Sequence, residues 1–256
     1  MSVWSKLRKV KAEDAPRLLI YGPPKMGKTT LASEFPGAIF LQVEDGTPGG
    51  NELNSFGKLD SFAEVMQALG SLYTETHEFK TIVIDSLDKL EPMVWAALCA
   101  EKKWESIETP GYGKGYTEAD NLWRDLVSGL NALRTDLGMT IIVICHSEIE
   151  RFDDPSTASY SQYQLRLHKR ARAIFSDEVD AILLVKQDVA IKQEEQGFNK
   201  TRAVAEGINR FIFCEARPAF LAGNRYGLPA KIRFDKGKGY AALAPFLPTH
   251  EAKQEK

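Results

Sequence analysis

The segment that most constrains how this chain can fold is residues 22–29, which read GPPKMGKT and match the pattern G-x-x-x-x-G-K-[ST]. An apolar run at residues 18–21 precedes it, and a helical pattern that begins at Thr29 follows it. Glycines in such a loop let the backbone approach an anion, and the amide groups at the start of the next helix point partial positive charge at it. The sequence therefore predicts a buried strand, a phosphate-binding loop and a helix in direct succession.

Each chemical group of this loop has an expected task. The cradle comprises Gly22, Pro23, Pro24, Lys25, Met26, Gly27, Lys28, Thr29 and Thr30. The Lys28 ammonium is expected to reach the β- and γ-phosphates of a nucleoside triphosphate, and the Thr29 hydroxyl is expected to bind Mg²⁺. A Gly-rich turn without a ligand is the alternative, but such a turn requires neither the lysine nor the hydroxyl. We therefore expect ATP and Mg²⁺ as cofactors, while the preference for ATP over other triphosphates stays open.

The bulk properties of the chain are those of a globular protein. Its 256 residues are 43% hydrophobic and 27% charged, with a formal net charge of -2. We expect a polar arm at residues 1–14, one domain at residues 15–248 and a polar tail at residues 249–256. Because the net charge is close to zero, a surface for nucleic acid must be local. The cysteines are scattered and no apolar stretch is long enough to span a bilayer, so we expect a cytoplasmic protein without a membrane partner.

Apolar strands alternate with helical patterns along the chain, which indicates an α/β fold with a mostly parallel sheet and helices on its faces. The expected strands of this sheet are residues 17–21, 38–43, 81–85, 140–145 and 181–185. Shorter β patterns at residues 210–215 and 230–234 indicate an antiparallel extension on the C-terminal side. Together with the phosphate loop, this order predicts the fold class of the P-loop NTPases.

Glycine and polar residues mark two expected loops. Residues 110–116 are Gly-rich and predict a loop, after which Thr117 is expected to cap a long helix that ends at Gly138. A second, polar loop is expected at residues 146–161. A basic helix is expected to follow it at about residues 163–175.

Carboxylates and one histidine at strand ends supply the groups that hydrolysis needs. Asp85 ends an apolar strand, where a P-loop ATPase places the carboxylate that holds Mg²⁺ through water; capping the next helix is the alternative. Glu44 follows the second strand, so it is expected at the carboxyl edge of the sheet, where it could orient or deprotonate a water molecule. Asp45 competes for that role, and a solvated loop carboxylate is the alternative for Glu44. His146 ends a strand and is expected either to sense the γ-phosphate or to hydrogen-bond the backbone in the core.

The order of these parts resembles the core of the RecA-like recombinases. The parts are a phosphate loop, a glutamate after the second strand, an aspartate after the third, a Gly-rich loop, a long helix and a strand that ends in a polar residue. The resemblance implies a RecA-like sheet, catalytic roles for Lys28 and Glu44, and a sensor role for His146. It also implies that two loops, residues 104–116 and 147–161, bind single-stranded DNA.

More closely, the chain resembles the short phage-type P-loop proteins of the Sak type, which are RecA-like single-strand annealing ATPases. The strings that carry this resemblance are residues 22–29, 84–88 (IDSLD), 111–116 (GYGKGY), 146–148 (HSE), 152–155 (FDDP) and 224–229 (NRYGLP). They span the chain from about residue 17 to residue 229. One departure is Gly223, at a position just before Asn-Arg where we expect a lysine that could reach a neighbouring subunit's nucleotide. This departure moves the expected trans-acting cation to Arg225 or Arg217.

Two local groups carry positive charge, and the first combines it with aromatic rings, as surfaces that bind single strands do. The group in the Gly-rich loop comprises Tyr112, Lys114 and Tyr116. In the expected basic helix, Arg166, Lys169 and Arg170 stand at i, i+3 and i+4, so they are predicted to share one face. The alternatives are core packing for the tyrosines and an ordinary solvated face for the charges.

The predicted function is a RecA-like ATPase that acts on single-stranded DNA in recombination or strand annealing, in the host cytoplasm if a phage encodes it. Because the net charge offers little attraction for DNA, tight binding is expected to need a filament or ring of this chain, or a single-strand-binding protein as a partner. The alternative is an accessory module of helicase-loader or packaging type with slow or no hydrolysis. A small-molecule phosphotransferase is disfavoured because no Arg-rich lid is evident.

Overall fold

The computed structural model of the protein describes residue 4 and residues 14–46, 52–153, 159–196 and 200–248. At residues 188–196 and 200–208 it describes the backbone alone. The predicted polar tail and nearly all of the predicted polar arm therefore lie outside the described residues, and the domain boundaries stay predictions.

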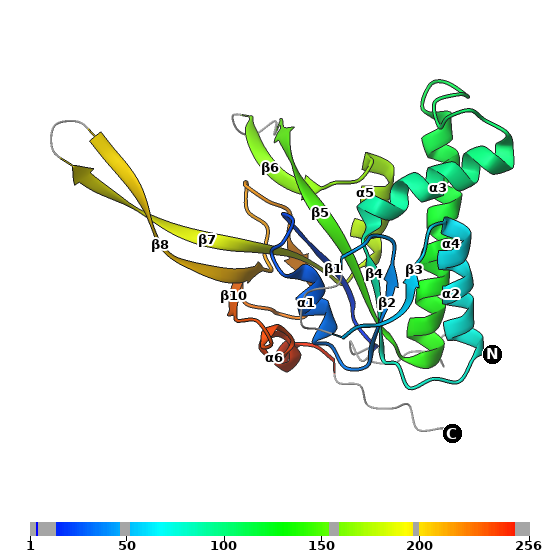
Figure 1. The fold of residues 1–256 in the computed structure, drawn as a ribbon, viewed down its shortest axis with the longest axis horizontal. Helices are drawn as coiled ribbons and strands as arrows, with labels where there is room; N and C mark the ends of the chain where they lie inside the picture. Colours follow the sequence, from blue (N-terminus) through cyan, green and yellow to red (C-terminus); the bar gives the residue numbers. More distant parts are fainter. Residues whose placement is uncertain (1–3, 5–13, 47–51, 154–158, 197–199, 249–256) are drawn as a thin grey trace.

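A single large sheet organises the fold (Figure 1), with the order β10-β8-β7-β1-β5-β4-β2-β3; β6 pairs with β5 and β9 with β7. The strands are β1 Arg17–Gly22, β2 Ala38–Gln42, β3 Asn54–Lys58, β4 Thr81–Asp85, β5 Thr140–Phe152, β6 Tyr160–Leu165, β7 Ala181–Gln196, β8 Lys200–Phe213, β9 Gly223–Asn224 and β10 Lys231–Phe234. The six strands from β7 to β3 are parallel, and β8 and β10 extend them antiparallel. The expected α/β fold class, a mostly parallel sheet with an antiparallel extension on its C-terminal side, is confirmed.

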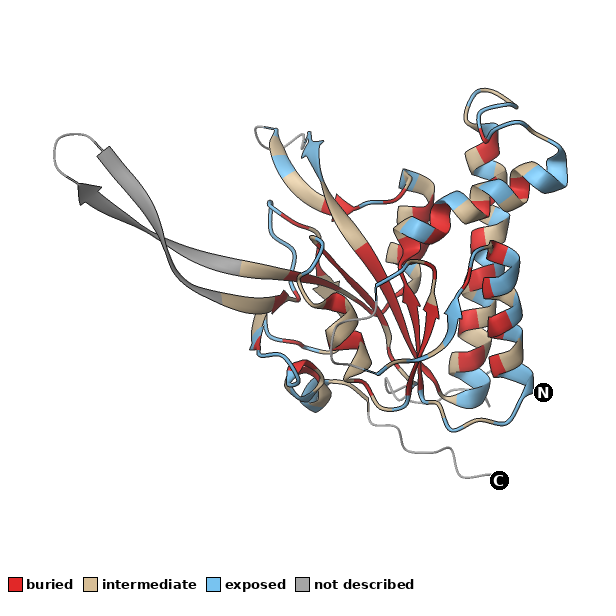
Figure 2. Cartoon of the chain, in the orientation of Figure 1, coloured by how far each residue is buried: buried red, intermediate tan, exposed pale blue. Residues whose placement is uncertain are grey.

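Helices cover both faces of this sheet (Figure 2). They are α1 Lys28–Ser33, α2 Phe62–Thr74, α3 Leu87–Lys102, α4 Lys114–Leu137, α5 Lys169–Glu178 and α6 Gly239–Leu243. Side chains of α2, α3, α4 and α5 join one apolar core, and those of α1 and α6 join another on the opposite face. A sheet buried on both faces explains why its strands read as continuous apolar runs rather than as alternating patterns.

Strand β1 shows how the sequence divides between the two cores. Leu19 and Tyr21 pack into the core under the long helices, whereas Leu18 and Ile20 pack into the core under α1. All four are fully buried, and each aliphatic side chain of this size contributes about 1.5–3 kcal/mol when removed from water. The phosphate loop that follows β1 therefore leaves a rigid, doubly buried strand.

The Gly-rich segment is shorter as a loop than the sequence predicts. Helix α4 begins at Lys114, after Gly113 in the left-handed conformation, and the predicted cap at Thr117 is wrong because its hydroxyl donates to the Gly113 carbonyl inside the helix. A Cβ on Gly115 would lie 1.9 Å from the carbonyl oxygen of Ile107. This glycine therefore permits close packing against the first helical turn, although its presence is typical of a loop. The predicted end at Gly138, with φ of 67°, agrees with the structure.

The predicted polar loop at residues 146–161 is also corrected. Strand β5 continues to Phe152 and pairs antiparallel with β6, in a register that places Ser147 opposite Leu165. The predicted basic helix at residues 163–175 starts later than expected, because α5 begins only at Lys169. The hairpin of β5 and β6 runs past the core (Figure 1), so it lacks the apolar pattern that signals a strand. Residues 154–158, within the predicted loop, lie outside the described part.

The antiparallel side of the sheet is longer than predicted. Strands were expected at residues 181–185 and 210–215, but β7 extends to Gln196 and β8 begins at Lys200. The two strands form a long hairpin that projects beyond the rest of the sheet (Figure 1). Strand β3 also escaped the sequence prediction, because its residues are mostly exposed and polar.

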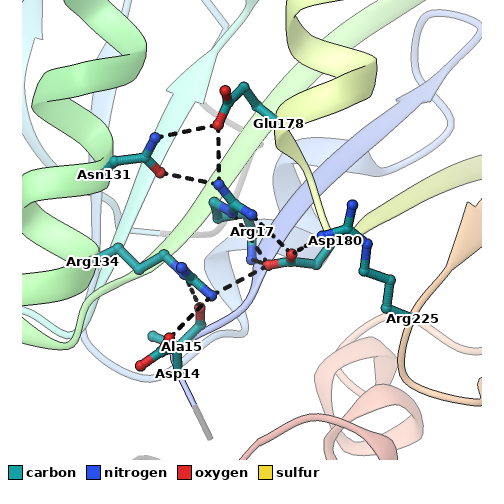
Figure 3. Close-up of polar contacts among 8 residues, drawn as sticks. All are labelled: Asp14, Ala15, Arg17, Asn131, Arg134, Glu178, Asp180 and Arg225. Carbon is teal, nitrogen blue, oxygen red and sulfur yellow. Dashed lines mark hydrogen bonds and ion pairs between the residues drawn. The ribbon is translucent and has the colours of Figure 1, made fainter. Parts of the chain in front are cut away.

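A cluster of ion pairs fixes the edge of the sheet opposite the phosphate loop (Figure 3). The buried carboxylate of Asp180, just before β7, binds the guanidinium of Arg17 at 3.0 Å and that of Arg225 at 3.1 Å. Arg134 of α4 lies 3.7 Å from the same carboxylate. Burial alone would raise the pKa of Asp180, but the hydrogen bonds from Arg17 outweigh it and hold the pKa below its ordinary value. The cluster joins β1, β7 and α4 at their shared edge.

Candidate nucleotide-binding site

The phosphate loop takes its shape from two glycines. Gly22 has φ of 151°, and a Cβ there would lie 2.2 Å from the carbonyl oxygen of Val185 in β7. Gly27 has φ of 93° and stands directly before helix α1. Residues other than glycine rarely adopt either of these backbone conformations. The loop therefore closes tightly between β1 and α1, with the amide groups of the helix start turned to the cleft side.

Lys28 lies inside this loop rather than in solvent. Its ammonium donates to the carbonyl oxygens of Gly22 at 3.0 Å and Pro23 at 2.9 Å. Burial lowers the pKa of Lys28, and the nearby carboxylates of Asp85 and Asp88 oppose that change. The cation is thus held at the mouth of the cradle, where a phosphate oxygen can replace the loop carbonyls as its partner.

The two predicted Mg²⁺ ligands meet. The Thr29 hydroxyl donates a hydrogen bond to the Asp85 carboxylate at 2.7 Å. Burial raises the pKa of Asp85, the Thr29 hydrogen bond opposes the rise, and the neighbouring Glu44 carboxylate adds to it. Hydroxyl and carboxylate oxygens are ligands that Mg²⁺ prefers. The described residues contain no cluster of three metal-ligating side chains, so the pair fits an ion that takes its other ligands from phosphate and water.

Glu44 reaches the same cleft, whereas its competitor Asp45 does not. The Ser86 hydroxyl donates to the Glu44 carboxylate at 3.3 Å, next to Asp85. Asp45 is exposed and lies 3.7 Å from the ammonium of Lys58. The geometry therefore favours Glu44 over Asp45 as the carboxylate that faces a bound nucleotide.

His146 is fixed by a buried carboxylate that sequence reasoning did not assign to the site. Both its backbone N–H, at 2.9 Å, and its ring Nδ1, at 3.1 Å, contact Asp88 in the first turn of α3. Arg166 binds the same carboxylate. Burial would raise the pKa of Asp88, but His146 and Arg166 hold it well below its ordinary range. Its sequence signals were its spacing of three residues from Asp85 and its place in the string IDSLD at residues 84–88.

These groups line one cleft of about 340 Å³ at the carboxyl edge of β1, β4 and β5. Its lining residues are Lys25, Gly27, Lys28, Thr29, Thr30, Glu44, Gly46, Asp85, His146, Arg210 and Lys236. The structure thus brings the predicted loop, metal, catalytic and sensor residues together. Arg210 and Lys236 were missed, because they come from β8 and from the segment after β10, far along the chain and without a recognisable motif.

Comparison with known proteins assigns the chain to a family. A sequence model of the AAA domain matches residues 14–226, which is more than half of the chain. The chain belongs to the AAA domain family. A crystal structure of the RadB recombinase is similar to the chain at 16% identity, with a TM-score of 0.46, over 88% of this chain and 90% of that chain. The AAA domain family supports an ATP-binding P-loop ATPase.

The three residues of the Gly-rich segment that were predicted to contact DNA differ in their exposure. Tyr112 is fully exposed, with φ of 51°. Lys114 is exposed at the first residue of α4. Tyr116 instead stacks on His168 with ring centroids 4.1 Å apart, and its hydroxyl binds Glu108. The structure thus leaves two of the three available to a ligand and uses the third in packing.

The predicted basic face on one helix is wrong. Arg166 precedes α5 and binds Asp88, while Arg170 binds Asp120 of α4 at 2.6 Å. Lys169 is exposed at the start of α5. The partners of these arginines are carboxylates on other elements, which a single helical pattern cannot show. Most of the charge that the sequence offered as a basic face is therefore neutralised.

Neither of the two candidate trans-acting cations lines the cleft of its own chain. Arg225 pairs with Asp180 at the opposite edge of the sheet, as Figure 3 shows. Arg217 is exposed and its backbone pairs with Phe220. Any role toward a neighbouring subunit stays a prediction.

None of the described helices is long and apolar enough to cross a membrane.

Proposed function

We propose that this chain is a Mg²⁺-dependent ATPase that acts on single-stranded DNA in recombination or strand annealing, as a phage-type Sak protein would. The observation that carries the ATPase assignment is the meeting of Lys28, the Thr29–Asp85 pair and Glu44 in one cleft. These groups come from the ends of three strands, and each matches one requirement of phosphoryl transfer to water.

The chain's own residues have separate roles in this proposal. Lys28 leaves the loop carbonyls and binds phosphate oxygens, which stabilises charge on the triphosphate. Glu44 holds a water molecule and accepts its proton. Thr29 and Asp85 would hold Mg²⁺, which supplies charge neutralisation and orients the phosphates when it is bound. His146 lines the cleft from the end of the buried part of β5, and in this proposal it contacts the terminal phosphate.

The contact between His146 and Asp88 supports a link from the nucleotide to the hairpin of β5 and β6. His146 lies where β5 leaves the core, and Arg166 follows β6 directly. Both bind the Asp88 carboxylate, so one buried group holds both bases of the hairpin. A change in the His146 contact on hydrolysis would therefore alter the support of a segment that the RecA-like resemblance implicates in DNA binding.

The case for single-stranded DNA rests on local features. Tyr112 and Lys114 combine an exposed ring with a positive charge between glycines, and bases can stack on such a ring. The net charge of -2 supports binding by several subunits together, in a filament or ring, or with a single-strand-binding protein. The free thiols of Cys99, Cys145 and Cys214 are typical of a reducing compartment, which supports action in the cytoplasm.

The experiment that tests this proposal is phosphate release from Mg²⁺·ATP with and without single-stranded DNA, read beside particle size. We expect release that DNA stimulates and that Lys28→Ala abolishes. If the chain hydrolyses ATP but single-stranded DNA neither binds to it nor stimulates hydrolysis, the DNA role would be contradicted. The ATPase assignment would then still stand. Absence of both binding and release would contradict the ATPase assignment itself.

One observation favours a second function, a nucleotide-gated accessory module of helicase-loader or packaging type. The arginines near the β5–β6 hairpin are paired with carboxylates, since Arg172 binds Glu148 at 3.0 Å and Glu150 at 2.6 Å. Neutralised arginines attract a polyanion weakly, which suits a protein partner better than DNA. Tight ATP binding with no measurable phosphate release would support this function over the first.

A further inference from the structure

Arg210 reaches the phosphate cleft from the antiparallel side of the sheet. It lies in β8 opposite Gln187 of β7. Gln187 comes three residues after Leu184, which is the last β7 residue that pairs with β1. A Cβ on Gly27 would stand 3.4 Å from the Nη1 atom of Arg210. The glycine that shapes the start of α1 therefore also leaves space for this guanidinium beside the loop.

Lys236 reaches the same cleft from the segment between β10 and α6, which is tied to the phosphate-loop helix. The Glu34 carboxylate, at the end of α1, accepts N–H groups from Gly237 at 2.8 Å and Tyr240 at 3.0 Å. The rings of Phe35 and Tyr240 pack with centroids 4.7 Å apart. Because α1 and this segment are joined at these points, Lys236 keeps a fixed relation to the phosphate loop.

The charges in the cleft are unbalanced. Its lining carries four cations, Lys25, Lys28, Arg210 and Lys236, and two carboxylates, Glu44 and Asp85. Among the described residues, the side chains of Arg210 and Lys236 have no hydrogen-bond or ion-pair partner, whereas the guanidinium groups of Arg166, Arg170 and Arg225 each bind a carboxylate. A half-buried guanidinium without an anion, beside a phosphate loop, is suited to an anionic ligand.

We propose that Arg210 and Lys236 bind the phosphates of the nucleotide that their own chain holds, so that each chain supplies in cis the extra cations of its site. This inference rests on the proposed ATPase function and assigns to it two residues from the antiparallel extension. It also means that the nucleotide's charge is met without Arg217 or Arg225 of another subunit. Lys28, Arg210 and Lys236 then surround the phosphates from the loop, β8 and the segment before α6.

The first test compares nucleotide affinity in matched variants of the full chain. Arg210→Ala and Lys236→Ala remove the cleft cations, and Arg233→Ala and Lys238→Ala remove exposed cations of β10 and of the same segment. We expect the cleft variants to bind Mg²⁺·ATP about tenfold more weakly, with a smaller loss for Mg²⁺·ADP and none for adenosine, because charged hydrogen bonds to phosphate are lost.

Three results decide this test. Arg210→Lys should recover part of the ATP affinity, which separates loss of charge from loss of fold, and circular dichroism of each variant checks the fold directly. If the wild-type chain binds Mg²⁺·ATP and the affinities of Arg210→Ala and Arg233→Ala for it are equal, this inference would be overturned. The ATPase proposal would remain intact. A wild-type chain that binds no triphosphate would overturn both.

The second test separates cis from trans action by mixing subunits. Arg210→Ala chains keep an intact phosphate loop, and Lys28→Ala chains keep Arg210. If Arg210 acts in cis, neither chain has a complete site, so the phosphate release of the mixture should equal the sum of its parts. If a neighbouring subunit supplies Arg210, the mixture should release phosphate well above that sum, and the cis assignment would be wrong.

Discussion

The hydroxyl of Thr29 and the carboxylate of Asp85 are joined by a 2.7 Å hydrogen bond across 56 positions of sequence. Strand β5 separates β1 from β4 in the sheet, so the helix that follows the phosphate loop must lean over β5 for this contact to form. The contact sets two oxygen ligands side by side at the carboxyl edge. It therefore explains how a loop motif and a strand-terminal aspartate come together at the proposed metal site.

This contact predicts that Thr29→Ala weakens Mg²⁺-dependent ATP binding more than binding in EDTA. The hydroxyl contributes to the metal site and leaves the amide cradle unchanged, so we expect about a tenfold loss with Mg²⁺ and little change without it. Titration of a fluorescent ATP analogue in each buffer measures both values. Ser33→Ala is the control, because this hydroxyl of the same helix donates to the Thr30 carbonyl and does not line the cleft. Equal losses with and without Mg²⁺ would argue against the ligand role.

Glu44→Gln is expected to separate binding from hydrolysis. The amide keeps the shape of the side chain and cannot accept a proton from water, so phosphate release should fall by about 10²–10⁴-fold while ATP affinity stays within about twofold. Asp45→Asn is the control, since Asp45 is exposed and turned to Lys58. Should Asp45→Asn lose turnover and Glu44→Gln keep it, the two carboxylates would exchange roles.

The parallel core of the fold was predictable because its signals are local. The strand segments that end at Tyr21, Asp85 and Cys145 are buried on both faces, so each reads as an uninterrupted apolar run. The glycine-lysine-threonine motif then fixed the loop, and polar residues directly after those strands marked the carboxyl edge. Lys28 could be found from the loop motif, and Glu44 and His146 could be found because each directly follows a buried, mostly apolar run.

The missed parts depend on contacts between distant segments. Arg210 enters the cleft only because β8 pairs antiparallel with β7, and Asp88 becomes a partner of His146 only when β5 lies beside α3. The β5 residues beyond Cys145 are mostly polar and none of them is buried, so this part of the strand resembles a polar loop. Gly115 misled in the opposite direction, because a glycine used for close packing resembles one used for a turn.

A buried carboxylate gives the fold a dependence on pH. Glu91 of α3 accepts the backbone N–H of His168 at 3.0 Å; burial raises its pKa to about 7, with the carboxylates of Asp88 and Glu148 adding to the rise and Arg172 opposing it. The ordinary value is 4.5, so between pH 4.5 and 7 the folded chain binds more protons than the unfolded chain. The free energy of unfolding should therefore fall as pH rises through this window.

Glu91→Gln tests that expectation. The amide still accepts the His168 N–H and carries no charge, so the variant should lose this fall and be more stable than the wild type above pH 7 by about 1–3 kcal/mol. Urea unfolding at pH 5 and pH 8 measures the difference. Glu105→Gln, at an exposed position, is the control. If the free energy of unfolding falls by the same amount between pH 5 and pH 8 in the wild type and in both variants, Glu91 does not cause the fall.

Lys114→Ala is expected to weaken binding of single-stranded DNA in proportion to one phosphate contact. The ammonium is exposed at the start of α4, and its loss should lower the slope of log affinity against log salt by about 0.7. Binding to a poly-dT oligonucleotide at several salt concentrations gives the slope. Lys80→Ala, exposed just before β4 at the opposite edge of the sheet, should leave it unchanged. An unaltered slope in Lys114→Ala would remove this lysine from the DNA surface.

Tyr112→Ala should weaken the same binding by about 1–3 kcal/mol with no change in salt dependence, because a stacked ring carries no charge. Its full exposure between Gly111 and Gly113 leaves the ring little to pack against in the isolated chain, so removal should not alter stability. Tyr73→Ala is the matched control, since this tyrosine is also exposed but its hydroxyl donates to Asp136 on α4. Fluorescence anisotropy with labelled single strands compares the two. Equal effects of both substitutions would mean that Tyr112 has no specific contact with a base, and the exposed ring would then need a protein partner as its explanation.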